Sequence, residues 1–218
     1  MLESIQSHSP YHNVPDWSLR QLSIVSQQVV HGTQRAISRV LTMLERGRPE
    51  AAMIMKEVDH ASGRAYTIGI TGPPGAGKST IVDRLTSLWR QEGLTVGIIA
   101  VDPTSAFTGG AILGDRVRMQ RHYLDPGVFI RSVATRGETG GLPRIVKTMV
   151  RLLDASGMDV VIVETVGVGQ TELGIMKVAD TVLVTLVPES GDAIQALGTN
   201  KENLIALIGS GFSAQNIS

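Results

Sequence analysis

The sequence predicts an α/β fold in which a helical extension precedes a mostly parallel, doubly wound sheet. Three observations support this prediction. Short apolar runs alternate with segments of helical spacing, glycine-containing turns separate many of them, and a glycine-rich loop joins the first strand to the helix that follows it. Strands separated by helices form right-handed crossover units with parallel strands. We therefore expect a ligand site beyond the carboxyl ends of the strands.

The chain is predicted to have two parts, residues 1–62 and residues 63–218. The first part begins with a segment containing Ser, His, Asn and two prolines that has no clear period, so we expect a poorly ordered tail up to about residue 20. Apolar residues then recur at three- and four-residue steps, which is typical of amphipathic helices. The expected helices cover about 23–46, interrupted at 31–33 with Thr33 as N-cap, and about 50–58.

In the second part, continuous apolar runs indicate strands that are covered on both faces. Segments with apolar residues on one helical face lie between these runs. The expected strands are residues 66–71, 95–101, 128–133, 159–164 and 180–187. The expected helices are residues 78–92, about 115–122, 142–156 and 171–178.

The amino-acid composition argues against some classes of binding partner. Lysine plus arginine and aspartate plus glutamate both number 20, so the formal net charge of zero does not favour nucleic acid as a partner. The chain has no cysteine, no secretory signal pattern at its start, and no apolar run of the roughly 18 residues that a membrane-spanning helix needs. We therefore expect a cytoplasmic protein without a membrane or nucleic-acid partner.

Residues 72–79, Gly-Pro-Pro-Gly-Ala-Gly-Lys-Ser, match the phosphate-binding loop pattern G-x-x-x-x-G-K-[ST] between a predicted strand and a predicted helix. Loop amides and the helix N-terminus are expected to bind the phosphates of a nucleotide. Lys78 should reach the β- and γ-phosphates, and the Ser79 hydroxyl should ligate Mg²⁺. The alternative is a turn that matches the motif by chance. The predicted nucleotide-binding residues here are Gly72, Pro73, Pro74, Gly75, Ala76, Gly77, Lys78, Ser79 and Thr80.

Three acidic residues lie where a partner of the phosphate loop is expected. Asp102 follows the second strand, Glu164 ends the fourth, and Asp115 lies on the long segment after Asp102. Carboxylates are the hard oxygen ligands that Mg²⁺ requires, so Ser79, Asp102, Asp115 and Glu164 form the predicted metal set. The alternatives are a turn residue before a proline for Asp102, a helix cap for Asp115 and a surface ion pair for Glu164.

The segment after Glu164 adds two candidates. The Gly167 amide could sense a γ-phosphate, and Gln170 could orient an attacking water or cap the helix that follows. The predicted catalytic residues are Lys78, Glu164 and Gln170. Five arginines are candidates for a phosphate clamp and are otherwise solvated: Arg116, Arg118, Arg121, Arg131 and Arg136. The five histidines have no metal-ligand spacing and are expected at the surface.

Several motifs occur in one order: the phosphate loop, Val-Asp-Pro-Thr-Ser at 101–105, Thr-Arg-Gly at 135–137, Val-Glu-Thr-Val-Gly-Val-Gly-Gln at 163–170 and Gly-Asp-Ala-Ile-Gln at 191–195. With these motifs, the chain from about residue 25 to 197 resembles the MeaB/ArgK family of P-loop GTPases. The resemblance implies a SIMIBI-type P-loop fold, GTP/GDP and Mg²⁺ as ligands, and a homodimer. It also implies a chaperone that hydrolyses GTP while it loads and protects the cofactor of an adenosylcobalamin-dependent methylmalonyl-CoA mutase.

The C-terminal region departs from this family pattern. The family continues to an apolar strand and an Asn/Thr-Lys-x-Asp motif that reads guanine, whereas residues 211–214 here are Gly-Phe-Ser-Ala. Asn200-Lys-Glu-Asn203 looks similar but falls too early and ends in Asn. We therefore expect the guanine-reading motif, a last strand of the sheet and the arm used in dimer formation to be missing, which weakens the expectation of a dimer.

Three other functions remain as alternatives. The chain could bind nucleotide without turnover, because its purine site is expected to be incomplete. It could act as a transport-system (LAO/AO-type) kinase or ATPase with the same loop, a label also given to this family pattern. A nickel-insertion GTPase fits least, because the chain has neither cysteine nor a histidine-rich tract.

Overall fold

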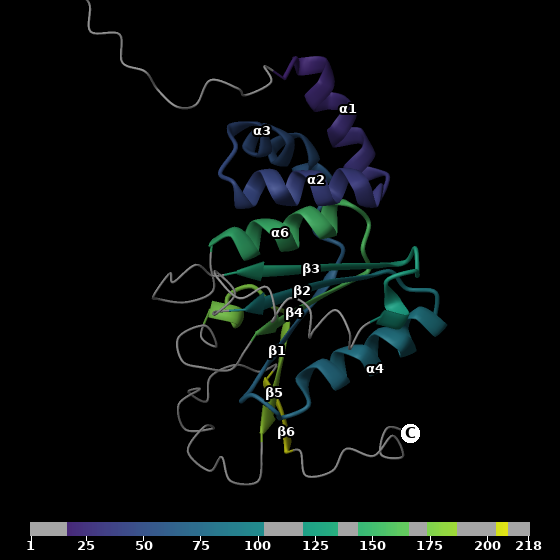
Figure 1. The fold of residues 1–218 in the computed structure, drawn as a ribbon, viewed down its shortest axis with the longest axis vertical. Coiled ribbons are helices and arrows are strands. Elements are labelled where there is room, and N and C mark those ends of the chain that lie inside the picture. The colour runs from purple at the N-terminus through teal and green to yellow at the C-terminus, as the bar shows by residue number, and fades with distance from the viewer. Residues whose placement is uncertain (1–16, 103–119, 135–143, 166–173, 187–203, 209–218) are drawn as a thin grey trace, which may run out of the picture.

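A six-stranded sheet forms the centre of the fold (Figure 1). The computed structural model describes residues 17–102, 120–134, 144–165, 174–186 and 204–208. The strand order is β3-β2-β4-β1-β5-β6, and all neighbouring strands are parallel, which confirms the predicted fold class. The strands are β1 (Tyr66–Thr71), β2 (Val96–Asp102), β3 (Val128–Ala134), β4 (Val160–Thr165), β5 (Thr181–Leu186) and β6 (Leu204–Ile208).

Helices cover both faces of the sheet, as a doubly wound arrangement requires. On one face, Val82 of α4 (Lys78–Gln91) packs in an apolar cluster with Ile70 of β1 and Ile162 of β4. On the other face, α6 (Arg144–Ala155) packs in a second apolar cluster. Val161 and Val163 of β4, which alternate with Ile162 along the strand, belong to this second cluster. Both faces of β4 are therefore buried, in agreement with its unbroken apolar sequence.

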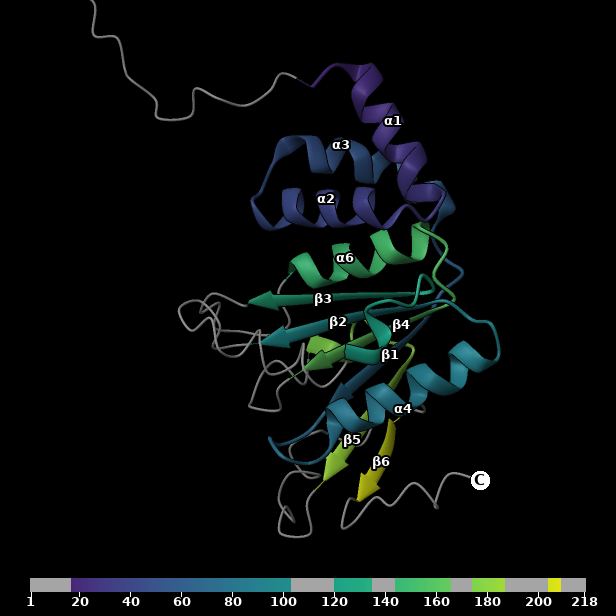
Figure 2. The same cartoon turned by 45° about the vertical axis from the view of Figure 1, so that its right-hand side comes forward.

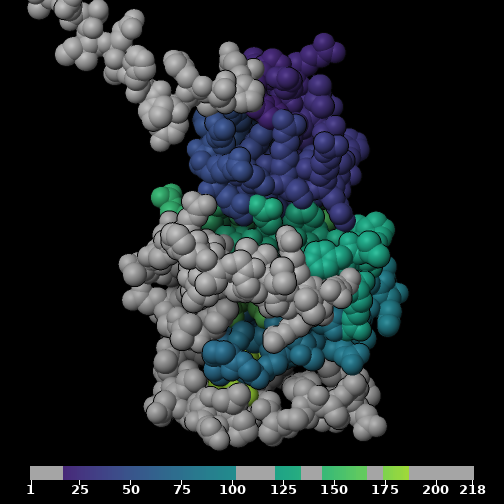
Figure 3. Space-filling view, viewed as in Figure 1, coloured from purple at the N-terminus to yellow at the C-terminus, as the bar shows by residue number. Residues whose placement is uncertain are grey.

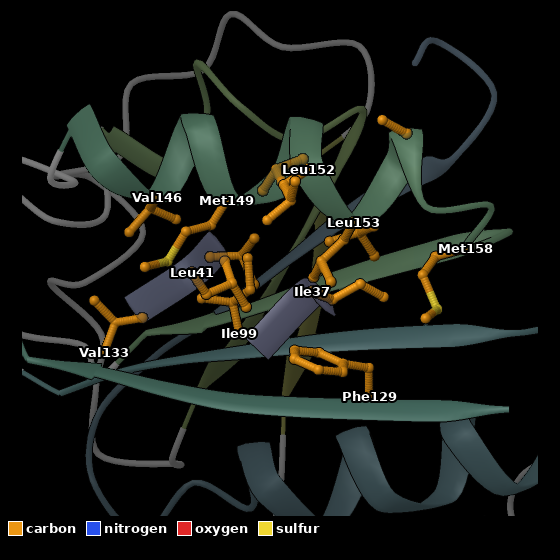
Figure 4. Packing of buried hydrophobic residues seen from close by; sticks show 14 of the residues in the cluster. Ile37, Leu41, Ile99, Phe129, Val133, Val146, Met149, Leu152, Leu153 and Met158 are labelled. Atoms are coloured by element: carbon orange, nitrogen blue, oxygen red, sulfur yellow. The ribbon is translucent and has the colours of Figure 1, made fainter. Parts of the chain in front are cut away.

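Three N-terminal helices cover the outer side of α6 (Figure 2). They are α1 (Leu19–Val30), α2 (Gln34–Glu45) and α3 (Pro49–Val58). Figure 4 shows Ile37 and Leu41 of α2 next to Met149 and Leu153 of α6, above Phe129 of β3. The helices, α6 and the sheet thus share one continuous apolar cluster. The predicted division of the chain into two parts at residue 62 stays a prediction.

Helix α1 begins earlier than the apolar spacing predicts. Ser18 is its N-cap: the Ser18 hydroxyl accepts from the Gln21 amide at 3.3 Å, and the Ser18 amide donates to Gln21 Oε1 at 3.0 Å. This reciprocal capping box satisfies amides that the first turn leaves without partners. Thr33 occupies the N-cap position of α2 as predicted, but its side chain makes no capping hydrogen bond.

Strand β6 corrects the expectation that the sheet lacks its last strand. Leu204–Ile208 pairs in parallel with β5 along its whole length, from Val182 opposite Leu204 to Leu186 opposite Ile208. Its apolar sequence suits a strand, although no strand was predicted at these residues. The helix predicted at 115–122 is described only at its end, where Gln120–His122 forms a 3₁₀ turn. Within the described part of the chain, no helix is long and apolar enough to cross a membrane.

Candidate functional site

The glycine-rich loop joins β1 to α4 and is exposed at its centre rather than paired within the sheet. Gly72, Gly75 and Gly77 have φ values of 137°, 80° and 82°, a region that residues with a Cβ rarely adopt. Gly77 is the N-cap of α4 and has a left-handed conformation. The Ala76 amide donates to the Pro73 carbonyl at 3.3 Å, which closes a turn. The motif therefore folds as the tight, exposed loop that it predicts.

Gly72 also lies against β5. A Cβ at this position would lie 2.2 Å from both the backbone oxygen and the hydroxyl oxygen of Thr185, closer than real Cβ atoms approach other atoms. The first glycine of the motif is thus required for two reasons, its backbone conformation and its close approach to β5. This contact fixes where the loop leaves the sheet.

The N-terminus of α4 faces the loop. Its first turn contains no acidic residue, and Gly77 has no side chain to cap the helix amides. The first amides of a helix have no intrahelical acceptor, and the helix dipole adds positive potential there. The arrangement therefore suits an anion such as a phosphate group.

Lys78 is buried, with 7% of its surface exposed, and its side chain curls back over the loop. Its ammonium nitrogen donates to the carbonyl oxygens of Gly72 at 2.6 Å and Pro73 at 2.8 Å. These contacts hold the ammonium group at the loop rather than in bulk solvent. Phosphate oxygens near the loop would lie within reach of a short side-chain movement.

Ser79 and Glu164 meet at the carboxyl ends of β1 and β4. The Ser79 hydroxyl donates to Glu164 Oε1 at 2.8 Å, and Glu164 is buried with 8% of its surface exposed. Parallel pairing places Glu164 opposite Ile70, just before the loop. A hydroxyl and a carboxylate oxygen this close form the kind of oxygen donor set that Mg²⁺ prefers, so these two residues fit the predicted metal.

Three threonines that were not predicted as site residues connect the strand ends around the loop by hydrogen bonds. Thr165 of β4 donates through its hydroxyl to the hydroxyl of Thr71, the last residue of β1, at 3.0 Å. The Thr185 hydroxyl of β5 donates to the Thr71 carbonyl at 3.0 Å. All three residues are buried. In the sequence, each of three apolar strands has a threonine near its carboxyl end. That the three threonines contact one another follows only from the strand order.

The other predicted site residues are only partly described. Asp102 is the last residue of β2, a strand adjacent to β4, and Val101 lies opposite Thr165. The backbone therefore brings Asp102 to the same edge of the sheet as Glu164, while its side chain lies outside the described part. Asp115, Gly167 and Gln170 lie outside the described residues, as do Arg116, Arg118 and Arg136.

The remaining clamp candidates, Arg121 and Arg131, form ion pairs with carboxylates of helices. Arg131 of β3 pairs with Glu45 at the end of α2, which ties the N-terminal helices to the sheet edge. Arg121 pairs with Asp83 of α4. Arg131 is part-buried and links two elements of the fold, which corrects the expectation of a solvated position. Arg121 forms its ion pair at the surface, with 49% of its side chain exposed, as expected.

The expectation of surface histidines is wrong for His122. Only 5% of its surface is exposed, and its Nε2 lies 3.0 Å from Asp83 Oδ1. A carboxylate only accepts, so Nε2 carries the proton. Burial, and secondarily the positive charge of Arg121, lower the pKa of His122 and favour the neutral ring.

A second contact attaches the turn after His122 to α4. Arg90 donates two hydrogen bonds to Asp125, at 2.9 and 3.0 Å, and these bonds lower the pKa of Asp125 and raise that of Arg90. His122 and Asp125 are thus both attached to the helix that begins at the phosphate loop.

A family profile described as methylmalonyl-CoA mutase-associated GTPase MeaB matches residues 37–207, most of the chain. The chain belongs to the MeaB family. An archaeal relative from Pyrococcus horikoshii, named provisionally as a GTPase, is 53% identical over 171 residues, which cover 78% of this chain and 54% of the relative. The GTPase ArgK of Escherichia coli is 36% identical over 76% of this chain and 51% of its own length.

Two further matches agree with membership of the MeaB family. A Caenorhabditis elegans protein named methylmalonic aciduria type A homolog, mitochondrial, is 34% identical over 78% of this chain and 47% of its own length. The crystal structure of a LAO/AO transport system kinase superposes with a TM-score of 0.64 at 27% identity, over 78% of this chain and 51% of that one. The chain thus spans about half the length of the curated relatives it matches.

Proposed function

We propose that the chain binds GTP and Mg²⁺ at the loop between β1 and α4 and hydrolyses GTP. The observation that carries this proposal is the 2.8 Å contact between Ser79 and Glu164 beside an exposed loop whose glycines have positive φ. A loop suited to binding an anion and two oxygens suited to binding a metal occur together where the strands of a parallel sheet end. Folds of this kind bind their ligands at that place. Membership of a GTPase family supports the same assignment.

Each residue has a distinct part in this proposal. Amides of residues 75–80 bind the phosphate oxygens, and Lys78 exchanges its contacts with the Gly72 and Pro73 carbonyls for the β- and γ-phosphates. The Ser79 hydroxyl and Glu164 hold Mg²⁺, which neutralises charge developing on the phosphates. Asp102 and Asp115 complete the proposed metal set. Gly167 senses the γ-phosphate, and Gln170 orients the attacking water.

We also propose that the hydrolysis serves an adenosylcobalamin-dependent acyl-CoA mutase of the methylmalonyl-CoA mutase type. The family description names association with this mutase, and the C. elegans relative carries a name that refers to methylmalonic aciduria. In this role, the nucleotide state would control loading and protection of the cobalamin cofactor in the mutase. The guanine-reading motif and the dimer arm of the family would also serve this function in the whole protein.

Hydrolysis of GTP by the purified chain, measured with and without the mutase, tests both parts of the proposal. We expect Mg²⁺-dependent release of phosphate that Lys78→Ala removes, and faster release when the mutase is present. Binding of GTP without release under either condition would favour a nucleotide-binding protein without turnover. Release that the mutase leaves unchanged would retain the GTPase and reject the partner.

A transport-system kinase is the second candidate, because the similar crystal structure bears that name. A kinase would transfer the γ-phosphate to a small molecule or protein rather than to water. Incubation with γ-labelled ATP and amino acids such as lysine, arginine and ornithine distinguishes the two. Label recovered only as inorganic phosphate would reject the kinase.

A further inference from the structure

A groove of about 640 Å³ lies on the N-terminal helices, away from the phosphate loop. We call it the arginine groove, because four arginines line it. Arg35, Arg39 and Arg46 lie along one side of α2, Arg48 precedes α3, and Trp17 and Glu50 also line the groove. In Figure 1, α6 and the sheet lie between α2 and α4, and Figure 3 shows the N-terminal helices forming one end of the molecule.

The groove concentrates positive charge in a chain whose formal net charge is zero. In the described part of the chain, none of its four arginines forms an ion pair, whereas Arg90, Arg121, Arg131 and Arg151 all do. Arg39 instead lies over the Trp17 ring, 4.2 Å from its centroid. Stacking of this kind orients the planar group and leaves its edge available for carboxylates. The groove is therefore complementary to negative charge.

The carboxylate of Glu50 places a second requirement on any ligand of the arginine groove. Only 8% of its surface is exposed, and its Oε2 is buried without a hydrogen-bond partner among the described residues. Buried carboxylate oxygens normally accept a hydrogen bond, so the Glu50 carboxylate has acceptor capacity that no described residue uses. Because Oε2 is closed to solvent, a donor in the groove would reach it only after the Glu50 side chain turns. A bare inorganic anion such as chloride or sulfate would bring further negative charge and no donor. A polypeptide brings carboxylates for the arginines and backbone N–H groups for Glu50.

We propose that the arginine groove binds an extended acidic segment of a partner protein, with acidic side chains on the arginines and a backbone N–H on Glu50. The length of the groove suits this occupant. From Arg35 to Arg46, α2 rises about 17 Å at about 1.5 Å per residue, which about five extended residues would span. The assignment does not depend on nucleotide binding at the loop.

Fluorescence anisotropy with the full chain tests the proposal. The probe is a fluorescein-labelled hexapeptide of alternating Glu and Ser, and its matched control contains Gln in place of Glu. We expect the Glu peptide to bind and its affinity to fall steeply with added NaCl, while the Gln peptide binds at least about tenfold more weakly. Equal binding of the two peptides would overturn the proposal.

Matched double variants localise the binding. Arg39→Ala/Arg46→Ala removes two exposed arginines of the groove, and Arg64→Ala/Arg84→Ala removes two exposed arginines outside it. We expect about a tenfold or greater loss of affinity in the first pair and less than about a twofold loss in the second. Equal losses would show attraction by overall charge and reject the site. Matching melting temperatures and circular dichroism spectra would establish that both pairs are folded.

Two further probes distinguish a peptide from a simple anion. A backbone N-methylated form of the Glu–Ser peptide keeps the charges but loses the N–H donors, so we expect it to bind several-fold more weakly. Sodium phosphate should displace the labelled peptide no better than NaCl of equal ionic strength. Equal binding of the methylated peptide, or strong displacement by phosphate, would contradict the assignment of a polypeptide.

Discussion

Ser79 Oγ donates a 2.8 Å hydrogen bond to Glu164 Oε1, although 85 positions separate the two residues in the chain. The contact arises because β1 and β4 are parallel neighbours whose carboxyl ends coincide, with Glu164 opposite Ile70. The strand pairing itself therefore brings two proposed Mg²⁺ ligands together. Such preorganisation lowers the ordering cost of binding the metal together with its nucleotide.

The first prediction concerns Glu164. Glu164→Ala removes a carboxylate ligand, so we expect the Mg²⁺ concentration that half-saturates GTP binding to rise about tenfold. Calorimetric titration of GTP at a series of Mg²⁺ concentrations measures this shift. Glu57→Ala, at an exposed position on α3, is the matched control and should leave the titration unchanged. An identical Mg²⁺ dependence in Glu164→Ala and the native chain would reject its role as a ligand.

The second prediction concerns Lys78. Lys78→Ala deletes the ammonium group proposed to face the β- and γ-phosphates, so GTP affinity should fall by about 30-fold or more. Isothermal titration calorimetry with GTP and GDP measures the loss. Lys147→Ala, on the exposed side of α6, removes an equal charge and should bind nucleotide normally. Unchanged affinity in Lys78→Ala would refute the loop assignment.

The third prediction separates crowding from backbone strain at Gly72. Gly72→Ala brings a Cβ to 2.2 Å from Thr185 oxygens, whereas Gly93→Ala, also at positive φ, meets no atom within 4 Å. Gly93→Ala should lower the free energy of unfolding by about 1 kcal/mol from strain alone. Gly72→Ala should lower it by about 3 kcal/mol, because the β5 backbone must also move. Urea denaturation measures both, and equal losses would show that the contact with Thr185 is unimportant.

The fourth prediction concerns pH. The pKa of His122 is lowered in the folded chain from an ordinary value of 6.5, so below that pH the unfolded chain binds a proton that the folded chain refuses. The free energy of unfolding should therefore decrease as the pH falls below 6.5. His122→Gln stays neutral and should flatten this slope in urea denaturations between pH 7 and about pH 5.

Exposed His60 provides the comparison for this titration. In the part of the chain that the structure describes, the His60 ring makes a hydrogen bond with the Glu57 carbonyl at 2.7 Å, three residues earlier. His60→Gln removes a surface histidine in place of the buried one and is measured in the same denaturations. A slope that disappears in His60→Gln and persists in His122→Gln would contradict the assignment to the buried ring.

The sequence predicted best the elements whose signals are local. The phosphate loop fixes the end of β1 and the start of α4, and both lie where the motif places them. Apolar runs located β4 and β5 to within one residue at each end, because a strand buried on both faces leaves a continuous apolar record. The prediction began this helix at about residue 23 and missed the capping box of Ser18 and Gln21, which marks where α1 begins.

Features that depend on strand order could not be predicted in this way. Thr71, Thr165 and Thr185 contact one another only because β4 and β5 flank β1, and the sequence carries no record of that adjacency. Burial of His122 likewise depends on how the chain returns to α4. Lys78, Ser79 and Glu164 were predicted because each belongs to a short motif at a strand end.

The apolar cluster that links α1, α2 and α3 to α6 and β4 makes the N-terminal helices and the sheet one cooperative folding unit. Heat or denaturant should accordingly produce a single transition, reported alike by Trp17 beside α2 and by Trp89 on α4. Cutting away the helices would expose the outer surface of α6 to water and weaken the strand that carries Glu164. The stability of the sheet edge that carries the proposed site is thus maintained partly by residues on the far side of the molecule.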